Sequence, residues 1–138
     1  MNDSVKFLNV GNQEFFPTLR KRVAEYFETK GKSTHANWQM ILKTVLIFSL
    51  YFVPYFLVLF APIPHWSYLF CAVMMGVGLA GIGMTIMHDA NHQAYSKNKT
   101  VNLILGYTLN FIGGSRSNWK IQHNKLHHTF TNIKGCLL

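Results

Sequence analysis

Two apolar stretches decide the fold: "ILKTVLIFSLYFVPYFLVLF" at residues 41–60 and "SYLFCAVMMGVGLAGIGMTIM" at residues 67–87. At about 1.5 Å per helical residue, a segment of about twenty residues spans the ~30 Å hydrocarbon core of a bilayer. The only charged side chain in either stretch is Lys43, which is near enough to the end for its ammonium group to reach the interface. Residues 61–66, "APIPHW", contain two prolines and predict a tight turn. The sequence thus predicts an all-α integral membrane protein with a two-span transmembrane hairpin.

Charge lies on both sides of this hairpin and is absent within it. The chain has 13 Lys and Arg against 5 Asp and Glu, a net charge of +8, yet residues 44–88 contain none of these four residue types. A basic excess can indicate nucleic acid or an anionic membrane surface. Its position beside an apolar block favours the membrane over a nucleic-acid partner. Because the turn lacks Lys and Arg, the positive-inside rule predicts that both flanks, including everything from His88 onward, are cytoplasmic.

Two further segments are predicted to be helices at the membrane surface. Residues 15–32 place apolar side chains on one face with basic residues around them, which is typical of an amphipathic surface helix. An ordinary helix packed on the rest of the protein is the alternative. Residues 101–114 are apolar but too short to span, so they predict an interfacial helix that returns the chain toward His88. The sequence therefore divides into a cytoplasmic N-terminal segment, 1–40, and a membrane domain, 41–138.

The second span contains a stripe of small residues. Gly76, Gly78 and Gly81 spell G-x-G-x-x-G, a pattern of dinucleotide-binding loops, but here they lie inside an apolar span. No acidic residue follows at the distance that such a loop requires. Small residues let membrane helices approach closely, so the stripe, which Gly83 extends, is predicted to serve helix packing.

Histidines are concentrated in two short stretches, "HDANH" at residues 88–92 and "HNKLHH" at residues 123–128. In an α-helix, residues four apart share a face, so the two histidines of the first stretch point the same way, as do the first two of the second. The last histidine is then turned roughly 100° aside. An isolated histidine near a membrane boundary is usually an interfacial polar residue, and we interpret His35 and His65 in that way. The five clustered histidines are His88, His92, His123, His127 and His128.

Two clusters with matched spacing on the same predicted side of the membrane indicate a metal site. Neutral imidazole is a common metal ligand and suits zinc, copper, iron and nickel. Zinc proteases use H-E-x-x-H, in which the glutamate is the general base, whereas "HDANH" has no glutamate. A zinc hydrolase is therefore disfavoured.

The sequence around the histidines resembles a known family. "GMTIMHDANHQAYS" at residues 83–96 and "NWKIQHNKLHHTFTNIKG" at residues 118–135 are similar to the first and second histidine boxes of the membrane-bound fatty acid desaturases. Both acyl-CoA and acyl-lipid desaturases carry such boxes, and the front-end group related to linoleoyl-CoA desaturases is one candidate. The resemblance implies the N-terminal half of a four-span desaturase fold. It also implies a di-iron centre of two Fe ions that uses O2 to introduce a cis double bond into a fatty acyl chain.

Carried over by position, the resemblance implies a role for nine residues. His88, His92, His123, His127 and His128 are the expected iron ligands. Asp89, Asn91 and Asn124 are expected to orient the imidazoles as hydrogen-bond partners. Trp119 is expected to line the substrate or cofactor surface, with an interfacial anchor as the alternative. The implied partners are a fatty acyl-CoA or acyl-lipid, the lipid bilayer and a separate electron donor, either a ferredoxin or a b-type cytochrome, because the His-Pro-Gly-Gly haem signature of a fused cytochrome is absent.

The chain departs from the family pattern in one large respect. The family has a third box, H/Q-x-x-H-H, after another pair of spans, and the 138 residues contain no such box. Five histidines are too few for two irons, so we expect this chain to be a fragment that is inactive by itself.

Two other functions are consistent with the two boxes. Membrane hydroxylases and related oxygenases use similar histidine boxes, but the resemblance of the sequence from Asp89 to Ser96 favours a desaturase over them. A small membrane protein that binds or transports a metal is the second alternative. Transporters usually place their ligands within the spans, whereas these histidines lie outside them.

Overall fold

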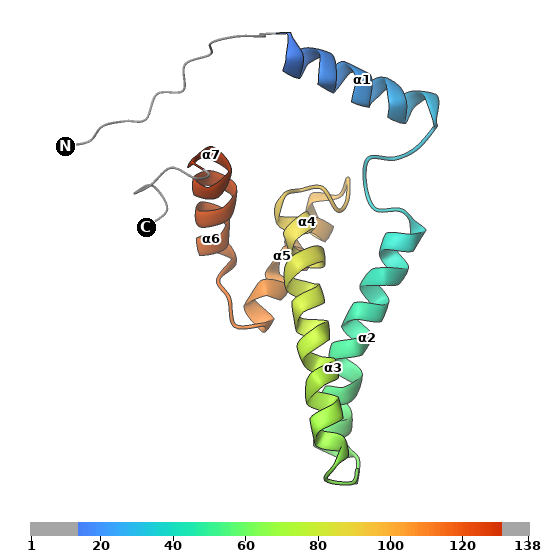
Figure 1. Ribbon diagram of the computed structural model, residues 1–138, viewed down its shortest axis with the longest axis vertical. Coiled ribbons are helices and arrows are strands. Elements are labelled where there is room, and N and C mark those ends of the chain that lie inside the picture. Colours follow the sequence, from blue (N-terminus) through green and yellow to red (C-terminus); the bar gives the residue numbers. More distant parts are fainter. Residues whose placement is uncertain (1–13, 131–138) are drawn as a thin grey trace, which may run out of the picture. The chain divides into compact units, whose positions relative to one another are not determined.

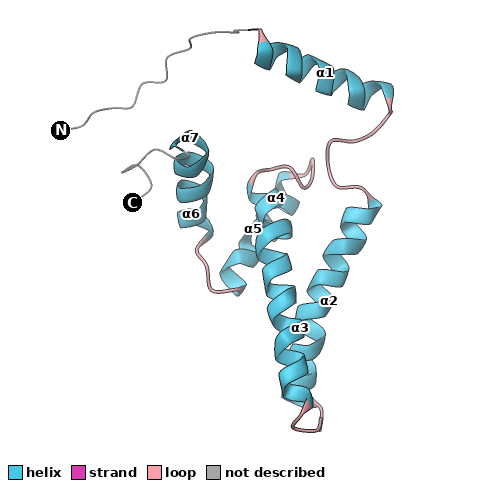
Figure 2. Cartoon of the chain, in the orientation of Figure 1, coloured by secondary structure: helices cyan, strands magenta, loops and turns pink. Residues whose placement is uncertain are grey.

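The computed structural model describes residues 14–130, and every regular element among them is helical (Figure 2). The chain divides into two compact units, Met1–Thr34 and His35–Leu138. The first unit contains one described helix, α1 (Phe15–Thr29). The second contains all the other helices and both histidine boxes. The observed elements thus agree with the all-α prediction.

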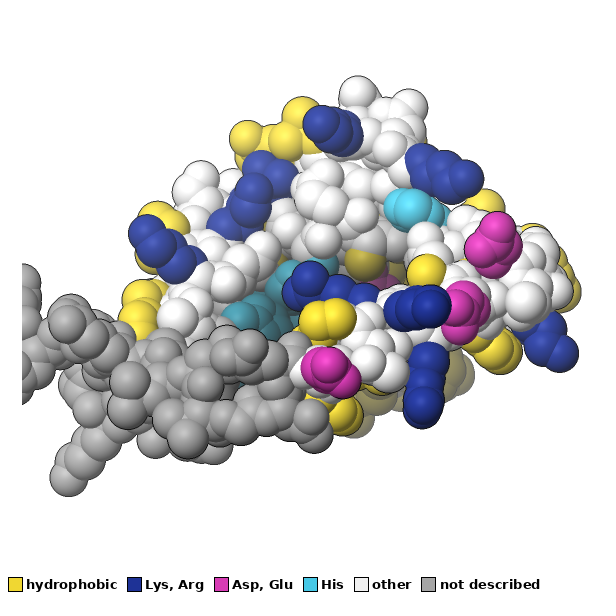
Figure 3. All heavy atoms as spheres, turned by 90° about the horizontal axis from the view of Figure 1, so that it is seen from above, with side chains coloured by type: hydrophobic (Ala, Val, Ile, Leu, Met, Phe, Trp, Pro, Cys, Tyr) yellow, Lys and Arg dark blue, Asp and Glu magenta, His cyan; other side chains and the backbone are white. Residues whose placement is uncertain are grey.

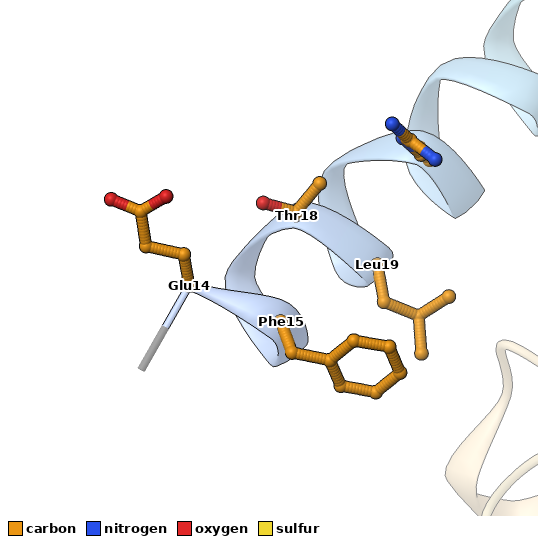
Figure 4. A pocket seen from close by; sticks show the side chains of 5 residues that line it. Glu14, Phe15, Thr18 and Leu19 are labelled. Atoms are coloured by element: carbon orange, nitrogen blue, oxygen red, sulfur yellow. The ribbon is translucent and has the colours of Figure 1, made fainter. Parts of the chain in front are cut away.

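Helix α1 is amphipathic and buries none of its side chains. It ends at Thr29, three residues before the predicted end at residue 32. Gly31, just beyond this end, has a positive φ of 57°, a conformation in which glycine commonly terminates helices. Figure 4 shows Glu14, Phe15, Thr18 and Leu19 beside an open surface pocket along the first turns of this helix. Among the residues that the structure describes, no histidine or cysteine lines this pocket, whereas the second unit carries both histidine boxes.

Two long helices form the predicted hairpin (Figure 1). Helix α2 (Trp38–Phe60) begins three residues earlier than predicted because the Asn37 side chain accepts a hydrogen bond from the Met40 amide and caps the helix. Helix α3 (Ser67–Gly81) continues through the π-helical segment η1 (Ile82–Ile86) into α4 (Met87–Asn91). The helical run therefore extends past residue 87 and includes most of the first histidine box, in agreement with the helical spacing predicted for His88 and His92.

Both long helical runs have the length and composition of membrane spans. Trp38–Phe60 has a mean hydropathy of 2.0 and Ser67–Asn91 of 2.1. Only 11% and 22% of their most apolar windows are buried. An apolar helix in the core of a soluble protein is mostly buried, so these exposed apolar surfaces fit contact with lipid. The hairpin is thus suited to a membrane.

Glycines make the contact between α2 and α3. A Cβ atom on Gly78 would lie 2.8 Å from the Tyr51 backbone nitrogen, and one on Gly81 would lie 3.0 Å from the Ile47 side chain. Gly76, by contrast, has open space where its Cβ would be. Gly78 and Gly81 therefore make the close helix contact that was predicted, whereas Gly76 makes none with the described residues.

The chain after the first box is held by buried polar contacts. The Tyr95 hydroxyl lies 2.8 Å from Thr44 Oγ1 of α2. The Ser96 amide donates to Asn102 Oδ1 at 2.9 Å, and Asn102 Nδ2 donates back to the Ser96 carbonyl at 2.7 Å. Asn102 is only 1% exposed, which strengthens the electrostatics of both bonds. These contacts fix the loop between the first box and the next helix.

Helix α5 (Lys99–Phe111) packs beside α4 and η1 and leads away from the first box, and the chain turns back after it (Figure 1). It corresponds to the apolar segment predicted at 101–114 and is capped by Asn98, whose side chain accepts from the Thr100 amide. Gly113, with φ at 87°, forms the following turn. The chain continues as α6 (Arg116–Trp119), the π-helical η2 (Lys120–His127) and α7 (His128–Phe130), which carry the second box.

Candidate metal centre

The first histidine box lies at the end of the second long helical run. His88 is in α4, and His92 is the residue that caps it. Their ring centroids are 4.6 Å apart, as expected for residues one helical turn apart. His88 Nδ1 lies 3.3 Å from Asp89 Oδ1, so the carboxylate contacts one ring nitrogen and leaves the other for a ligand.

The second box meets the first. The His123 ring centroid lies 5.0 Å from that of His88 and 5.2 Å from that of His92. Residues 31 and 35 positions apart thus come into direct contact, which is the convergence that the sequence predicted. Figure 3 shows histidine side chains in cyan and numerous Lys and Arg side chains in dark blue on the face that it views.

The last two histidines do not take the arrangement that an α-helix would give. The ring centroid of His128 lies 5.1 Å from that of His92 and 4.9 Å from that of His123. The His127 ring stacks on His123, with the centroids 5.3 Å apart. His128 thus joins the cluster, as the predicted convergence of five imidazoles requires, although an α-helix would turn it roughly 100° aside. The reason is the π-helical hydrogen bonding of η2, whose i→i+5 bonds widen the turn and bring the residue five positions on nearer to the same face.

The arrangement of ring nitrogens fits a metal ion. One ligand atom from each of His88, His92 and His123 can be chosen so that all three lie within 4.8 Å of one another. Among the described residues, the buried His123 Nε2 has no hydrogen-bond partner. A buried polar atom without a partner is costly, and coordination of a metal would satisfy it.

The electrostatics of the cluster favour neutral imidazoles. Burial lowers the pKa of His92 below its ordinary value, and the neighbouring His88 and His128 lower it further, although Asp89 acts in the opposite direction. Burial and the four surrounding histidines likewise lower the pKa of His123. The neutral form is the one that donates a lone pair to a metal, so these shifts keep the two residues ready to bind one.

Trp119 forms one wall of the cluster. Its ring stacks on His123 with the centroids 4.3 Å apart and the planes at 17°. Its ring centroid is also 5.7 Å from that of His88 and 5.5 Å from that of His92. An open pocket lies beside it, lined by Trp119, Gln122, His123, Leu126 and His127. Trp119 thus contacts histidines from both boxes, and its expected role at a cofactor surface remains a prediction.

The three other polar residues singled out in the sequence lie in different places. Asp89 contacts a histidine directly, as described above. The Asn91 side chain contacts no histidine in the observed hydrogen bonds and instead bonds to Gly106 and Arg116. Asn124 Nδ2 donates to the Asn91 carbonyl at 3.2 Å, while Asn124 Oδ1 is buried and, among the described residues, has no partner.

Sequence reasoning missed Arg116 and Gly106. Arg116 Nε donates to Asn91 Oδ1 at 2.8 Å, and Gly106 supplies a carbonyl to the same side chain. A single basic residue and a single glycine in a membrane-flanking segment carry no pattern that indicates such a contact. The two π-helical segments were also missed: one precedes the first box, and the other contains all of the second box except His128.

Comparisons with known proteins agree with this site. A family model described as "Fatty acid desaturase" matches residues 64–135. The chain is 40% identical over 121 residues to the sn-1 linoleoyl-lipid 6-desaturase of Synechocystis sp.. This alignment covers 88% of this chain and 34% of that protein. The chain is 33% identical over 130 residues to an acyl-lipid (8-3)-desaturase of Physcomitrium patens, covering 94% of this chain and 27% of that protein. No solved structure matches the chain.

The chain spans about a third of the length of curated relatives such as the 6-desaturases of Synechocystis sp. and Arthrospira platensis. Within that part, the family match includes both histidine boxes and the second long helical run. The apolar hairpin and the family match together make this a membrane protein. The chain belongs to the fatty acid desaturase family.

Proposed function

We propose that this chain is the part of a fatty acid desaturase that contributes the first two histidine boxes to an iron centre. The observation that supports the proposal most strongly is the convergence of His88, His92 and His123, whose ligand atoms lie within 4.8 Å of one another. The ligand set consists of imidazoles without thiolates, which suits iron and argues against an iron–sulfur cluster. The five histidines of the two boxes would hold the metal together with ligands from the third box of the family.

In this proposal, the chemistry that two bound irons supply is the O2-dependent removal of two hydrogen atoms from neighbouring carbons of an acyl chain. The residues of this chain hold and orient the ligands. Asp89 contacts Nδ1 of His88, which fixes the ring and leaves Nε2 for the metal. Trp119 covers His123 on one face, which restricts the access of water to that ligand.

The membrane arrangement and the partners follow from the same proposal. The uncharged turn at 61–66 lies on the far side of the membrane and both boxes face the cytoplasm, with the N-terminal segment 1–40. The complete protein has the four-span fold of the family. Its substrate is an acyl-lipid, as the names of the relatives suggest, with an acyl-CoA as the alternative. A separate acidic electron carrier, a ferredoxin or a b-type cytochrome, docks on the basic cytoplasmic face.

A chimera tests the proposed activity. The 121-residue segment of the Synechocystis sp. desaturase that aligns with this chain is replaced by the residues of this chain. The chimera is expressed in a host that does not make 6-desaturated lipids, and the fatty acids are analysed by mass spectrometry. We expect linoleoyl lipids to gain a double bond, because this chain supplies the same two boxes. His92→Ala in the chimera is expected to abolish the product, and His65→Ala in the turn is expected to preserve it.

Three outcomes would contradict the proposal. A chimera that reaches the membrane and binds iron but makes no double bond would remove the desaturase assignment. A hydroxylated fatty acid in place of the unsaturated one would favour a membrane hydroxylase. The 138-residue chain expressed without the rest of a desaturase is expected to give no product, because its five clustered histidines are too few to hold two irons. Product from that chain would refute the shared-centre proposal.

A further inference from the structure

Three hydrogen bonds join Asn91 in the first histidine box to later parts of the chain, and two of them reach the segment that carries the second box. The Asn91 side chain is 1% exposed. Its Nδ2 donates to the Gly106 carbonyl of α5 at 3.3 Å, and its Oδ1 accepts from Arg116 Nε of α6 at 2.8 Å. Its backbone carbonyl accepts from Asn124 Nδ2 in the second box at 3.2 Å. A residue inside the first box is therefore bonded to the helix before the second box and to the second box itself.

These bonds matter because apolar burial does not position the second box. None of the residues 116–130, which form α6, η2 and α7, is buried. A helix with a buried apolar face is held by packing, which this segment lacks. Among the described residues, the contacts that join it to the first box include the two hydrogen bonds to Asn91 and the ring contacts among the histidines and Trp119.

Arg116 is itself held firmly. Its guanidinium carbon lies 4.9 Å from the centroid of the Tyr107 ring, a cation–π contact with α5. A Cβ on Gly106 would collide with Asn91 Oδ1 and would lie 2.9 Å from Arg116 Nε. The glycine thus leaves the space in which the Arg116–Asn91 bond forms. The bond joins residues 25 positions apart and ends seven residues before His123.

We infer that Arg116 is a positioning residue whose Nε–H bond to Asn91 sets the second histidine box against the first. This inference rests on the proposed metal centre, because its consequence is the placement of His123 beside His88 and His92. Among the described residues, no hydrogen bond or ring contact joins Arg116 to these three histidines, and it acts through the helix that carries His123. A lost bond would let the second box move, which would spread the ring nitrogens apart and weaken metal binding.

Two substitutions of matched length separate the bond from the charge. Arg116→Gln keeps an N–H donor on the atom that follows Cδ but removes the positive charge. Arg116→Met has a similar length, with a methyl group at that place and no donor. The full chain is purified in detergent, and Co2+ alone is titrated while its d–d absorption is recorded. We expect Arg116→Met to bind Co2+ about tenfold to 100-fold more weakly, with an altered spectrum. Arg116→Gln is expected to stay within about threefold of the original protein, with the original spectrum.

A second measurement is made on the metal-free protein. Amide hydrogen exchange of residues 120–128 is expected to accelerate in Arg116→Met and to remain unchanged in Arg116→Gln, while exchange in α2 stays the same in both. Equal Co2+ affinity and equal exchange in the two variants would overturn the inference. If the original protein does not bind Co2+, the proposed metal centre fails, and the exchange of residues 120–128 still decides whether Arg116 positions the second box.

Discussion

Replacing His123 with alanine is expected to weaken binding of Fe2+ or Co2+ to this chain by at least about 100-fold. Loss of a residue that only supports a metal ligand costs about 10-fold to 100-fold in affinity, and loss of a ligand should reach or exceed the upper end. His123 is the ring that contacts both histidines of the first box. Its removal leaves only His88 and His92 of the three histidines whose ligand atoms lie within 4.8 Å of one another, and two imidazoles are too few for a stable site.

The measurement is a metal titration of the purified chain with its d–d absorption spectrum, using His65→Ala as the control. His65 lies in the turn between the spans and contacts Tyr68, so its loss should leave the affinity unchanged. The two neighbouring histidines refine the test. The His128 ring contacts His92 of the first box, whereas the His127 ring stacks on His123 of its own box, so His128→Ala should cost more affinity than His127→Ala. Equal binding by His123→Ala and the original protein would exclude a site shared by the two boxes.

Replacing Gly78 with alanine is expected to lower the free energy of unfolding of the hairpin by about 1–3 kcal/mol. The added Cβ would lie 2.8 Å from the Tyr51 backbone nitrogen and 2.9 Å from the Tyr51 Cβ. Backbone cannot move aside as the end of a flexible side chain can, so α2 and α3 must separate. Alanine is the better helix former by about 1 kcal/mol, and this gain offsets only part of the loss.

Gly76→Ala is the matched control on the same helix. Its Cβ meets no atom within 4 Å, so it gains the helix preference without a clash and should leave the stability unchanged or slightly raised. Both variants are unfolded in detergent mixtures of increasing sodium dodecyl sulfate and followed by circular dichroism. A Gly78→Ala protein as stable as Gly76→Ala would contradict the close contact of the two helices at this position.

The two spans could be predicted from the sequence because length and the absence of charge suffice. The first and last residues of the spans could not be predicted in the same way. The start of α2, for example, depends on one hydrogen bond, from the Met40 amide to the Asn37 side chain. The second run continues through η1 into residues 88–91, so the end of the helix does not coincide with the end of the apolar stretch. Hydropathy measures transfer into lipid and is insensitive to such local bonds.

The convergence of the histidines could also be predicted, because an apolar segment too short to span has to return the chain to the same side. The identity of the closest rings could not. The order of contact depends on whether the box is α-helical or π-helical, and nothing in "HNKLHH" specifies the i→i+5 bonds of η2. The contact of Arg116 with Asn91 is likewise a product of tertiary packing between segments 25 residues apart.

The most direct test of the account is iron K-edge X-ray absorption on the purified chain loaded with Fe2+. If the two boxes form one site, the spectrum will show at least three imidazole nitrogens bound to iron, since three histidine ligand atoms already lie within 4.8 Å of one another. The imidazole count will fall in His123→Ala and stay unchanged in His65→Ala. A spectrum without imidazole scattering, or one that His123→Ala does not alter, would contradict a metal centre shared by the two boxes.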